Sequence, residues 1–343
     1  MRVAVIPGDG IGKEVVSATL PVLEFLSDTL RQDLSYDVFG WGADQWLATG
    51  VGLPPGAIKL LTSEYAAVYL GAFGDPRIPD MAHGRDILLG LRRGLDLYVN
   101  YRPVILKDRV VDVYRENTQG LYAGVGGSVA RAGSVDVAID ECVYTREAVQ
   151  RFVLFCLRRL RDSGRRRATL VHKANAVPNT GKLWQEVFSG EIAKIPELAG
   201  SEEYVDSFCY RFILDQSPYE GVLTSNLLGD IISDIGAALM GGLGLASSAS
   251  ICPETNFALF EPVHGSAPDI AGRGIANPQA AAMSAALMLE HLGHAHASRI
   301  FRDCVAEVAR SDAATPDLGG HGTTQQFMDM VMRLLERDLE REG

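Results

Sequence analysis

The chain has 343 residues, of which 47% are hydrophobic and 22% are charged, so it can bury a sizeable core and is neither disordered nor membrane-like. A length of about 150 residues per domain predicts two domains. With 32 Lys and Arg residues against 43 Asp and Glu residues, the net charge is −11, which gives a nucleic-acid backbone no general attraction.

The first hundred residues alternate strand-like and helix-like segments. Residues 3–6 form a short apolar run typical of a strand, residues 13–30 place apolar side chains at helical spacing, and residues 66–70 predict another buried strand. The GDGIG motif at residues 8–12 lacks the spacing of a dinucleotide fingerprint, because Lys13 stands where the third glycine would be. We expect a tight strand-to-helix turn there, within a mostly parallel α/β sheet.

The pattern changes near residue 96, where a second domain is expected to begin. Residues 110–114 and 135–139 predict strands with one exposed face, separated by a loop at residues 120–133. No Pro-, Gly- or Ser-rich linker divides the chain. The chain is therefore expected to cross between its domains more than once.

The rest of the chain is mainly helical. Helical spacing indicates helices at residues 145–161, 227–239 and 277–292, and further helices starting at 297 and 323, with a strand at 168–171. Asn226 is placed to cap the helix that follows it. The uncharged residues 235–253 are too rich in Gly and Ser for a membrane span, so we expect a buried helix end followed by a loop.

Neither export nor disulfide bonding is expected. The first strand follows Met1 and Arg2 directly, without an apolar signal region. The five cysteines are odd in number, widely spaced and contain no C-x-x-C pair, so neither a disulfide framework nor a zinc site is indicated. A reducing cytoplasm fits this pattern.

Two acidic residues are candidates for a metal site. Asp230 and Asp234 are four residues apart on a predicted helix, so both point to one face. Their neighbours are apolar, which makes uncompensated charges costly, and a hard divalent cation with oxygen ligands would compensate them. The alternative interpretation is two solvated acids. A third acid such as Asp206 is possible, although no spacing indicates it.

Two further features have the chemistry of binding sites. Arg92, Arg102 and Arg115 lie around the domain change, and guanidinium groups hold carboxylates in bidentate geometry, which suits a di- or tricarboxylate. Residues 261–278 are dense in Gly, Pro and small polar residues and offer backbone donors to a ligand. Spacing does not show that the arginines converge, and the alternatives are solvated arginines and a long ordered connection.

Taken together, these segments resemble the β-decarboxylating dehydrogenases, the family of 3-isopropylmalate, isocitrate, homoisocitrate and tartrate dehydrogenases. The resemblance covers nearly the whole chain and is carried by several motifs in the same order. They occupy residues 6–12, 91–103, 115–118, 172–175, 226–230 and 261–278.

The resemblance implies a two-domain α/β fold of the isopropylmalate/isocitrate dehydrogenase type, which is not a Rossmann fold. Residues 1–97 with 242–343 would form a large domain that carries the cofactor loop, so that one domain is built from both chain ends. Residues 98–241 would form the domain that carries the dimer contacts and the metal and substrate groups.

The resemblance also implies the roles of individual residues. Leu88, Leu89, Arg92, Arg102 and Arg115 match the substrate-binding positions. Tyr122 and Lys173 match the acid-base pair, and Asp206, Asp230 and Asp234 match the ligands of Mg²⁺ or Mn²⁺. The NAD-binding positions are matched by Glu261, His264, Gly265, Ser266, Ala267, Asp269 and Asn277. The protein would be a homodimer in which Lys173 and Asp206 act in the neighbouring subunit's site.

Cofactor and substrate choice can be argued further. Asp269 would accept hydrogen bonds from a ribose 2′-hydroxyl and repel a 2′-phosphate, which predicts NAD. Leu88 and Leu89 are similar to the apolar pair that receives an isopropyl group, so the first expectation is conversion of 3-isopropylmalate to 4-methyl-2-oxopentanoate and CO₂. Residues 115–120 are also similar to tartrate and D-malate enzymes, and Arg85 would suit a polar or anionic substituent.

Other possibilities stay open at this point. Homoisocitrate, isocitrate or an unusual malate derivative would also suit the reaction class. A non-catalytic relative, similar to the regulatory subunits of isocitrate dehydrogenases, is the alternative of a different kind. It is disfavoured because such subunits lose metal or acid-base residues, whereas Tyr122, Lys173 and all three aspartates are present here.

Overall fold

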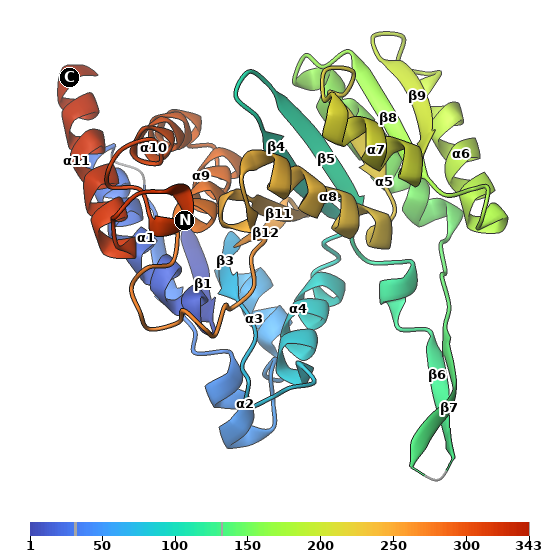
Figure 1. The fold of residues 1–343 in the computed structure, drawn as a ribbon, viewed down its shortest axis with the longest axis horizontal. Helices are drawn as coiled ribbons and strands as arrows, with labels where there is room; N and C mark the ends of the chain where they lie inside the picture. Colours follow the sequence, from blue (N-terminus) through green and yellow to red (C-terminus); the bar gives the residue numbers. More distant parts are fainter. Residues whose placement is uncertain (31–32, 132, 343) are drawn as a thin grey trace. The chain divides into compact units, whose positions relative to one another are not determined.

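The chain folds into two compact units. The computed structural model describes residues 1–30, 33–131 and 133–342. Unit 1 comprises Met1–Leu97 and Gly241–Gly343, and unit 2 comprises Tyr98–Met240. Unit 1 is therefore assembled from both ends of the sequence, as the blue and red segments of Figure 1 show.

Unit 1 contains a mixed but mainly parallel set of strands. These are β1 (Arg2–Gly8), β2 (Ser35–Val38), β3 (Ala67–Ala72), β11 (Ser247–Cys252) and β12 (Phe257–Pro262). Their order is β2-β1-β3-β12-β11, and only the β11–β12 pair among these neighbours is antiparallel. In register, Ala4 of β1 lies between Asp37 and Val68.

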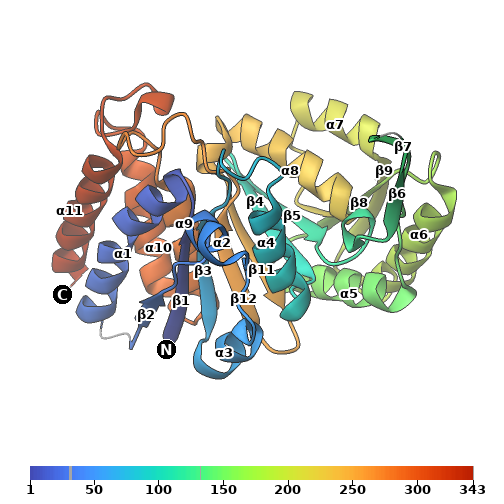
Figure 2. The ribbon, with the colours of Figure 1, turned by 90° about the horizontal axis from the view of Figure 1, so that it is seen from below.

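Helices cover both faces of the unit 1 strands (Figure 2). They are α1 (Ile11–Thr29), α2 (Ala43–Thr49), α3 (Ala57–Glu64), α4 (Ala82–Gly94), α9 (Gln279–His291), α10 (Ala295–Val308) and α11 (Thr324–Glu342), with short helices η2 (Leu243–Leu245) and η3 (Pro316–Leu318). Ile6 and Leu70 join a core cluster with Leu61 of α3 and Ile87 of α4. On the opposite face, the hydroxyl of Tyr69 donates to a backbone carbonyl of α9 at 2.9 Å. Strands buried on both faces read as continuous apolar runs.

Unit 2 repeats this layered plan. Its strands are β4 (Val99–Ile105), β5 (Val110–Glu116), β8 (Arg167–His172), β9 (Ala199–Tyr204) and β10 (Gly221–Thr224), in the order β4-β5-β10-β8-β9. Its helices are α5 (Arg146–Asp162), α6 (Pro178–Ile192), α7 (Val205–Leu214) and α8 (Asn226–Met240), with the short helix η1 (Leu121–Ala123). The β4–β5 pair is antiparallel and the other pairs are parallel.

The core of unit 2 fixes α8 against the strands. Val113 of β5 and Val222 of β10 pack in one cluster with Phe208 of α7 and Ile232 of α8. The packing places the acidic side chains of α8 beside the arginines of the strands β4 and β5.

The helix α5 begins with a capping hydrogen bond, because the hydroxyl of Thr145 accepts from the N–H of Ala148.

A two-stranded arm extends the second unit. Strands β6 (Gly126–Arg131) and β7 (Ser134–Asp140) pair antiparallel, and every side chain of both strands is exposed. The prediction of one exposed face was therefore wrong for both of its strands, because β5 is buried on both faces. The expected loop at residues 120–133 was wrong too, since it contains η1 and β6.

The Ser-rich segment after α8 also differs from the prediction. Residues 247–252 form the fully buried strand β11 instead of a loop, and they pair along their length with β12. Ser and Ala give a weak strand signal by themselves, so pairing with the strongly apolar β12 decides the structure. Across the described residues, every helix is too short or too polar to cross a membrane.

Candidate active site

Unit 2 brings two predicted arginines together with the acidic pair of α8. Arg102 lies on β4 and Arg115 on β5. Arg115 Nη1 donates to Asp230 Oδ1 at 2.5 Å, and Arg102 Nη1 lies 3.5 Å from the same oxygen and 3.9 Å from Asp234 Oδ1. One helical turn separates the two acids, so both face the guanidinium groups.

The guanidinium of Arg115 is fully enclosed. Arg115 is 1% exposed, and a buried charge of this kind is stable only when its donors are used. Its Nε and Nη2 donate to Asn226 Oδ1 at 3.0 and 2.8 Å. Gly229 permits this close packing, because a Cβ there would lie 2.6 Å from the Arg115 side chain.

Tyr122 completes the group. Its hydroxyl donates to Asp230 Oδ2 at 3.0 Å, and the Arg115 guanidinium carbon lies 5.2 Å from the centre of its ring. That distance is within the range of a cation–π contact. We call Arg102, Arg115, Tyr122, Asp230 and Asp234 the unit 2 cluster.

The acidic pair has the chemistry of a divalent-metal site. Burial raises the pKa of Asp234, Arg102 opposes that shift and the charge of Asp230 adds to it. A cation between the carboxylates would hold both of them in the charged form. The donors are all carboxylate oxygens, which hard cations such as Mg²⁺ prefer. Asp230 and Asp234 therefore fit a metal of the predicted kind.

Lys173 and Asp206 form a separate pair. Lys173 follows β8 and Asp206 lies in the first turn of α7, and Lys173 Nζ donates to Asp206 Oδ1. This bond lowers the pKa of Asp206. Within the described part of the chain, no three His, Cys, Asp or Glu residues are grouped to hold a metal. One chain therefore does not bring Asp206 to Asp230 and Asp234.

Unit 1 places Arg92 beside the start of the candidate cofactor loop. Arg92 lies near the end of α4, and its Nη2 donates to Glu261 Oε1 at 3.2 Å. Glu261 belongs to β12. The Nε of Arg92 is buried without a hydrogen-bond partner. This atom is a donor available to a ligand.

The other α4 residues divide into two environments. Leu88 packs against the unit 1 core, whereas Leu89 is half-buried outside that cluster. Arg85 is exposed and lies 3.8 Å from Asp80. At helical spacing, Arg85, Leu89 and Arg92 share one face. Leu88 is also at helical spacing from both arginines, and both leucines are half-buried, so the predicted Leu88–Leu89 pair stays a prediction.

The GDGIG turn supports the candidate cofactor loop. Gly8 and Gly10 have positive φ, at +71° and +52°, which confirms the predicted tight turn. The N–H of Ile11 donates to the carbonyl of Ser266 at 2.9 Å, and a Cβ on Gly10 would lie 2.1 Å from that carbonyl oxygen. The motif thus serves as a support for the loop.

The far end of the loop is held by residues that the sequence did not indicate. Asn277 Nδ2 donates to Asp317 Oδ2 at 2.9 Å, and the Thr315 hydroxyl donates to Asp317 Oδ1 at 2.5 Å. The Thr324 hydroxyl donates to the carbonyl of Ala276 at 2.6 Å. Asp317 lies 40 residues from Asn277 and Thr324 lies 48 residues from Ala276, so no local spacing could reveal these partners.

Inside the loop, His264 and Asp269 differ in exposure. His264 Nδ1 lies 2.9 Å from the Gly265 carbonyl, and its Nε2 is buried without a partner. Burial lowers the pKa of His264, which favours a neutral ring with Nε2 as an acceptor. Ser266 is buried, Asp269 and Gly265 are exposed, and Ala267 adopts a positive φ of +40°.

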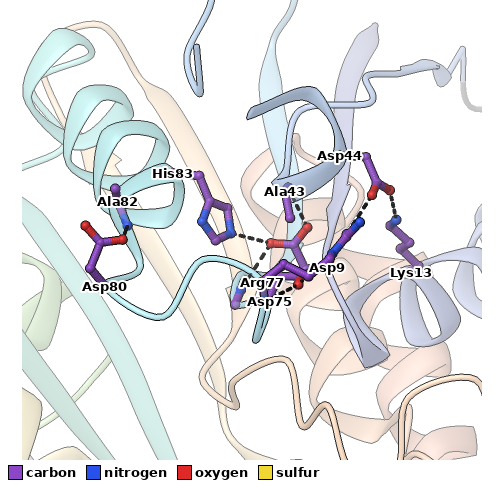
Figure 3. A network of polar contacts seen from close by, with 10 residues as sticks. Asp9, Lys13, Ala43, Asp44, Asp75, Arg77, Asp80, Ala82 and His83 are labelled. Carbon is purple, nitrogen blue, oxygen red and sulfur yellow. Dashed lines mark hydrogen bonds and ion pairs between the residues drawn. The ribbon is translucent and has the colours of Figure 1, made fainter. Parts of the chain in front are cut away.

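A buried carboxylate joins α4 to the GDGIG turn (Figure 3). Asp9 Oδ2 accepts from the N–H of Gly74 at 3.1 Å and lies 2.8 Å from His83 Nε2, while Oδ1 accepts from the N–H of Ala43 at 2.8 Å. Asp9 is 2% exposed and His83 is fully buried. Beside them, the exposed Asp44 bridges Lys13 and Arg77.

Replacing Asp9 by Asn should destabilise unit 1. In either orientation the new NH₂ group would face a backbone N–H donor, that of Ala43 or that of Gly74, so we expect a loss of about 3 kcal/mol in the free energy of unfolding. Urea denaturation measures it. Asp44→Asn is the matched control, because it removes an exposed charge and should have a much smaller effect. Equal losses in the two variants would contradict the assigned role of Asp9.

The chain is similar to known dehydrogenases along its whole length. The family model described as Isocitrate/isopropylmalate dehydrogenase matches residues 2–331. A 3-isopropylmalate dehydrogenase from Thermobifida fusca (strain YX) is 40% identical, with 98% of each chain covered. A "Probable tartrate dehydrogenase/decarboxylase" from Bacillus subtilis (strain 168) is 36% identical, again with 98% of each chain covered. The crystal structure of isocitrate dehydrogenase from Methylococcus capsulatus matches with a TM-score of 0.88 at 32% identity, covering 97% of this chain and 99% of that one.

Proposed function

The chain belongs to the isocitrate/isopropylmalate dehydrogenase family of oxidatively decarboxylating enzymes, and on that premise we propose that it oxidises and decarboxylates a malate-type 2-hydroxy acid with NAD and a divalent metal ion. The observation that carries the proposal is the unit 2 cluster, in which two carboxylates, two guanidinium groups and a phenol converge. These are the groups that binding an anionic substrate and moving its protons require.

Asp230 and Asp234 would hold Mg²⁺ or Mn²⁺, and Asp206 would supply a third carboxylate from a neighbouring subunit. When bound, the metal supplies Lewis acidity toward the oxygens of the substrate. The surrounding residues fix these ligands, because Asp230 accepts hydrogen bonds from both Arg115 and Tyr122. Such outer partners orient metal ligands and are part of the site.

The arginines would bind the substrate carboxylates. Arg102 is oriented by Asn100 and Ser233, with donor–acceptor distances of 2.8 and 2.7 Å, and Arg115 is oriented by Asn226. Guanidinium groups held in this way lose little conformational freedom when a carboxylate binds. Arg92 of unit 1 is assigned to the same substrate through the family resemblance and through its unpartnered Nε.

Tyr122 and Lys173 would transfer the protons. Lys173 would take the proton of the substrate hydroxyl, and NAD, when bound, would supply the hydride acceptor. Loss of CO₂ then leaves a carbanion-like carbon that must be reprotonated, and the Tyr122 hydroxyl is a suitable donor. Arg115 beside the Tyr122 ring stabilises negative charge on the phenol.

The cofactor proposal is NAD bound along residues 261–277. His264 offers an unpartnered buried acceptor and Asp269 an exposed carboxylate. A carboxylate at position 269 favours a free ribose 2′-hydroxyl over a 2′-phosphate.

The proposed first substrate is 3-isopropylmalate. The half-buried Leu89 and the name of the 40%-identical relative support it. A second candidate is a malate with a polar or anionic substituent. Arg85 favours it, because Arg85 lies on the same face of α4 as Leu89 and Arg92. The 36%-identical tartrate relative supports this alternative.

A substrate panel tests the proposal. NADH or NADPH formation is measured with Mg²⁺ or Mn²⁺ for 3-isopropylmalate, D-malate, L- and meso-tartrate, isocitrate and homoisocitrate. We expect the highest kcat/KM with 3-isopropylmalate and NAD. If another substrate is turned over faster than 3-isopropylmalate, and Arg85→Leu selectively loses this turnover, the second candidate would be the substrate. Equal or better kcat/KM with NADP contradicts the role of Asp269, and absence of all turnover would favour a regulatory relative.

The proposed assembly is a homodimer built through unit 2. Large apolar side chains are exposed on α7, where Tyr210, Ile213 and Leu214 are 69%, 54% and 66% exposed, and Ile231 of α8 is 50% exposed. The β6–β7 arm adds further exposed branched side chains at Val129, Val135, Val137 and Ile139. Apolar surface of this kind is typical of a protein–protein interface.

A further inference from the structure

Asn226 bonds to two parts of the candidate active site at once. We propose that Asn226 is a positioning residue whose single amide fixes both the Arg115 guanidinium and the loop that carries Tyr122. The proposal rests on the proposed function, because it takes Arg115 as a substrate-binding group and Tyr122 as a proton donor.

The oxygen end of the amide holds Arg115. Arg115 Nε and Nη2 donate to Asn226 Oδ1 at 3.0 and 2.8 Å. A guanidinium group has only donors, so the atom that faces it must be the amide oxygen. This contact leaves Nη1 of Arg115 directed at Asp230, at 2.5 Å. The amide therefore sets the plane of the guanidinium in the unit 2 cluster.

The nitrogen end holds the loop that follows β5. Asn226 Nδ2 donates to the carbonyl of Gln119 at 2.9 Å, and Tyr122 follows three residues later. Glu116 also holds this loop, because its carboxylate accepts hydrogen bonds from the N–H groups of Thr118 and Gln119 at 3.0 and 2.9 Å. A carbonyl only accepts, so this end of the amide must be the NH₂ group.

The surroundings leave the amide little freedom. Asn226 is 1% exposed, and its backbone N–H donates to the Tyr144 hydroxyl at 3.0 Å. Tyr144 in turn packs against Gly120 so closely that a Cβ there would lie 2.2 Å from the hydroxyl. The sequence predicted that Asn226 caps the helix that follows it. That prediction was wrong, because both ends of its side chain form hydrogen bonds with residues outside α8. A buried amide with both ends bonded specifies one arrangement.

Two substitutions separate the two ends. Asn226→Asp keeps an oxygen for Arg115 but turns an oxygen toward the Gln119 carbonyl, which repels it. We expect kcat to fall about 100-fold, because the Tyr122 loop is displaced, with the substrate KM within about threefold of wild type. Asn226→Ala removes both ends, so we expect the same fall in kcat together with a KM about tenfold higher.

The experiment measures kcat and KM with NAD, Mg²⁺ and the fastest panel substrate, and hydrogen–deuterium exchange of residues 117–123. Asn179→Asp, at an exposed position of α6, is the matched control and should resemble wild type. Two results together support the proposal: faster exchange confined to residues 117–123 in Asn226→Asp, and a lower kcat with a nearly unchanged KM in that variant. An unchanged kcat, with or without a raised KM, overturns it.

The exchange measurement keeps this test separate from the proposed function. If the wild-type protein turns over no panel substrate, the proposed function fails, and the positioning role is then decided by exchange alone. Wild-type exchange at residues 117–123 in Asn226→Asp overturns the role in that case. If Asn226→Ala does not fold, the isosteric Asn226→Asp, with its melting temperature checked against Asn179→Asp, decides the outcome.

Discussion

Asp230→Asn is expected to remove turnover while leaving the fold intact. The amide keeps an oxygen for Arg115 and a polar group for the Tyr122 hydroxyl, so the neighbouring hydrogen bonds are retained. The substitution removes the negative charge that a divalent metal would need. A loss of several kcal/mol of transition-state stabilisation corresponds to a fall in kcat/KM of about 1,000-fold or more. Initial rates of NADH formation over a Mg²⁺ titration measure it.

The control must also remove a carboxylate from unit 2. Asp162→Asn does so at the exposed end of α5, where Asp162 pairs with Arg161, and it should keep wild-type activity. The two variants should have similar melting temperatures. Full activity of Asp230→Asn at ordinary Mg²⁺ concentrations would disprove its assigned metal role.

Local patterns were sufficient for many of the elements. The apolar runs of β3 and β8 and the helical spacing of α5 depend on residues close together in the sequence, and all three elements are present. The strand β11 was missed because its serines pair with β12 only after a turn. The alternation of β7 was misread, since it predicts a covered face and both faces of the strand are exposed.

The candidate site divides in the same way. Asp230 and Asp234 could be paired from the sequence because one helical turn separates them, which is a local property. Their contacts with Arg102 depend on the packing of α8 against β4. The hydrogen bond from Arg102 to Ser233 of α8 joins residues 131 positions apart in the sequence. The long-range partners Asn226–Gln119, Asn277–Asp317 and Asp9–His83 had no local signal. Residue types predicted the chemistry, and tertiary packing supplied the orientation.

The second large expected effect is the recovery of activity when two inactive variants are mixed, and it concerns the paired residues Lys173 and Asp206. Both residues are proposed to act in the neighbouring subunit's site. In one chain they form a hydrogen bond with each other and, among the described residues, do not join Asp230 and Asp234 in a metal-binding group. Lys173→Met and Asp230→Asn should each be nearly inactive alone. If the sites are shared, a mixed dimer contains one site with both wild-type residues and one with neither.

Mixing the two inactive variants should therefore restore activity. When the variants are mixed in equal amounts, random exchange makes half of the dimers mixed, and each has one intact site of two, so recovery should approach about a quarter of wild-type activity. Native mass spectrometry measures the mixed fraction, and NADH formation measures recovery. Asp230→Asn mixed with Asp234→Asn is the control, because both substitutions lie on the same side of the shared site and no intact site forms. No recovery at a verified mixed fraction would place Lys173 and Asp230 of one chain in the same site, and a monomer by native mass spectrometry would overturn the shared arrangement altogether.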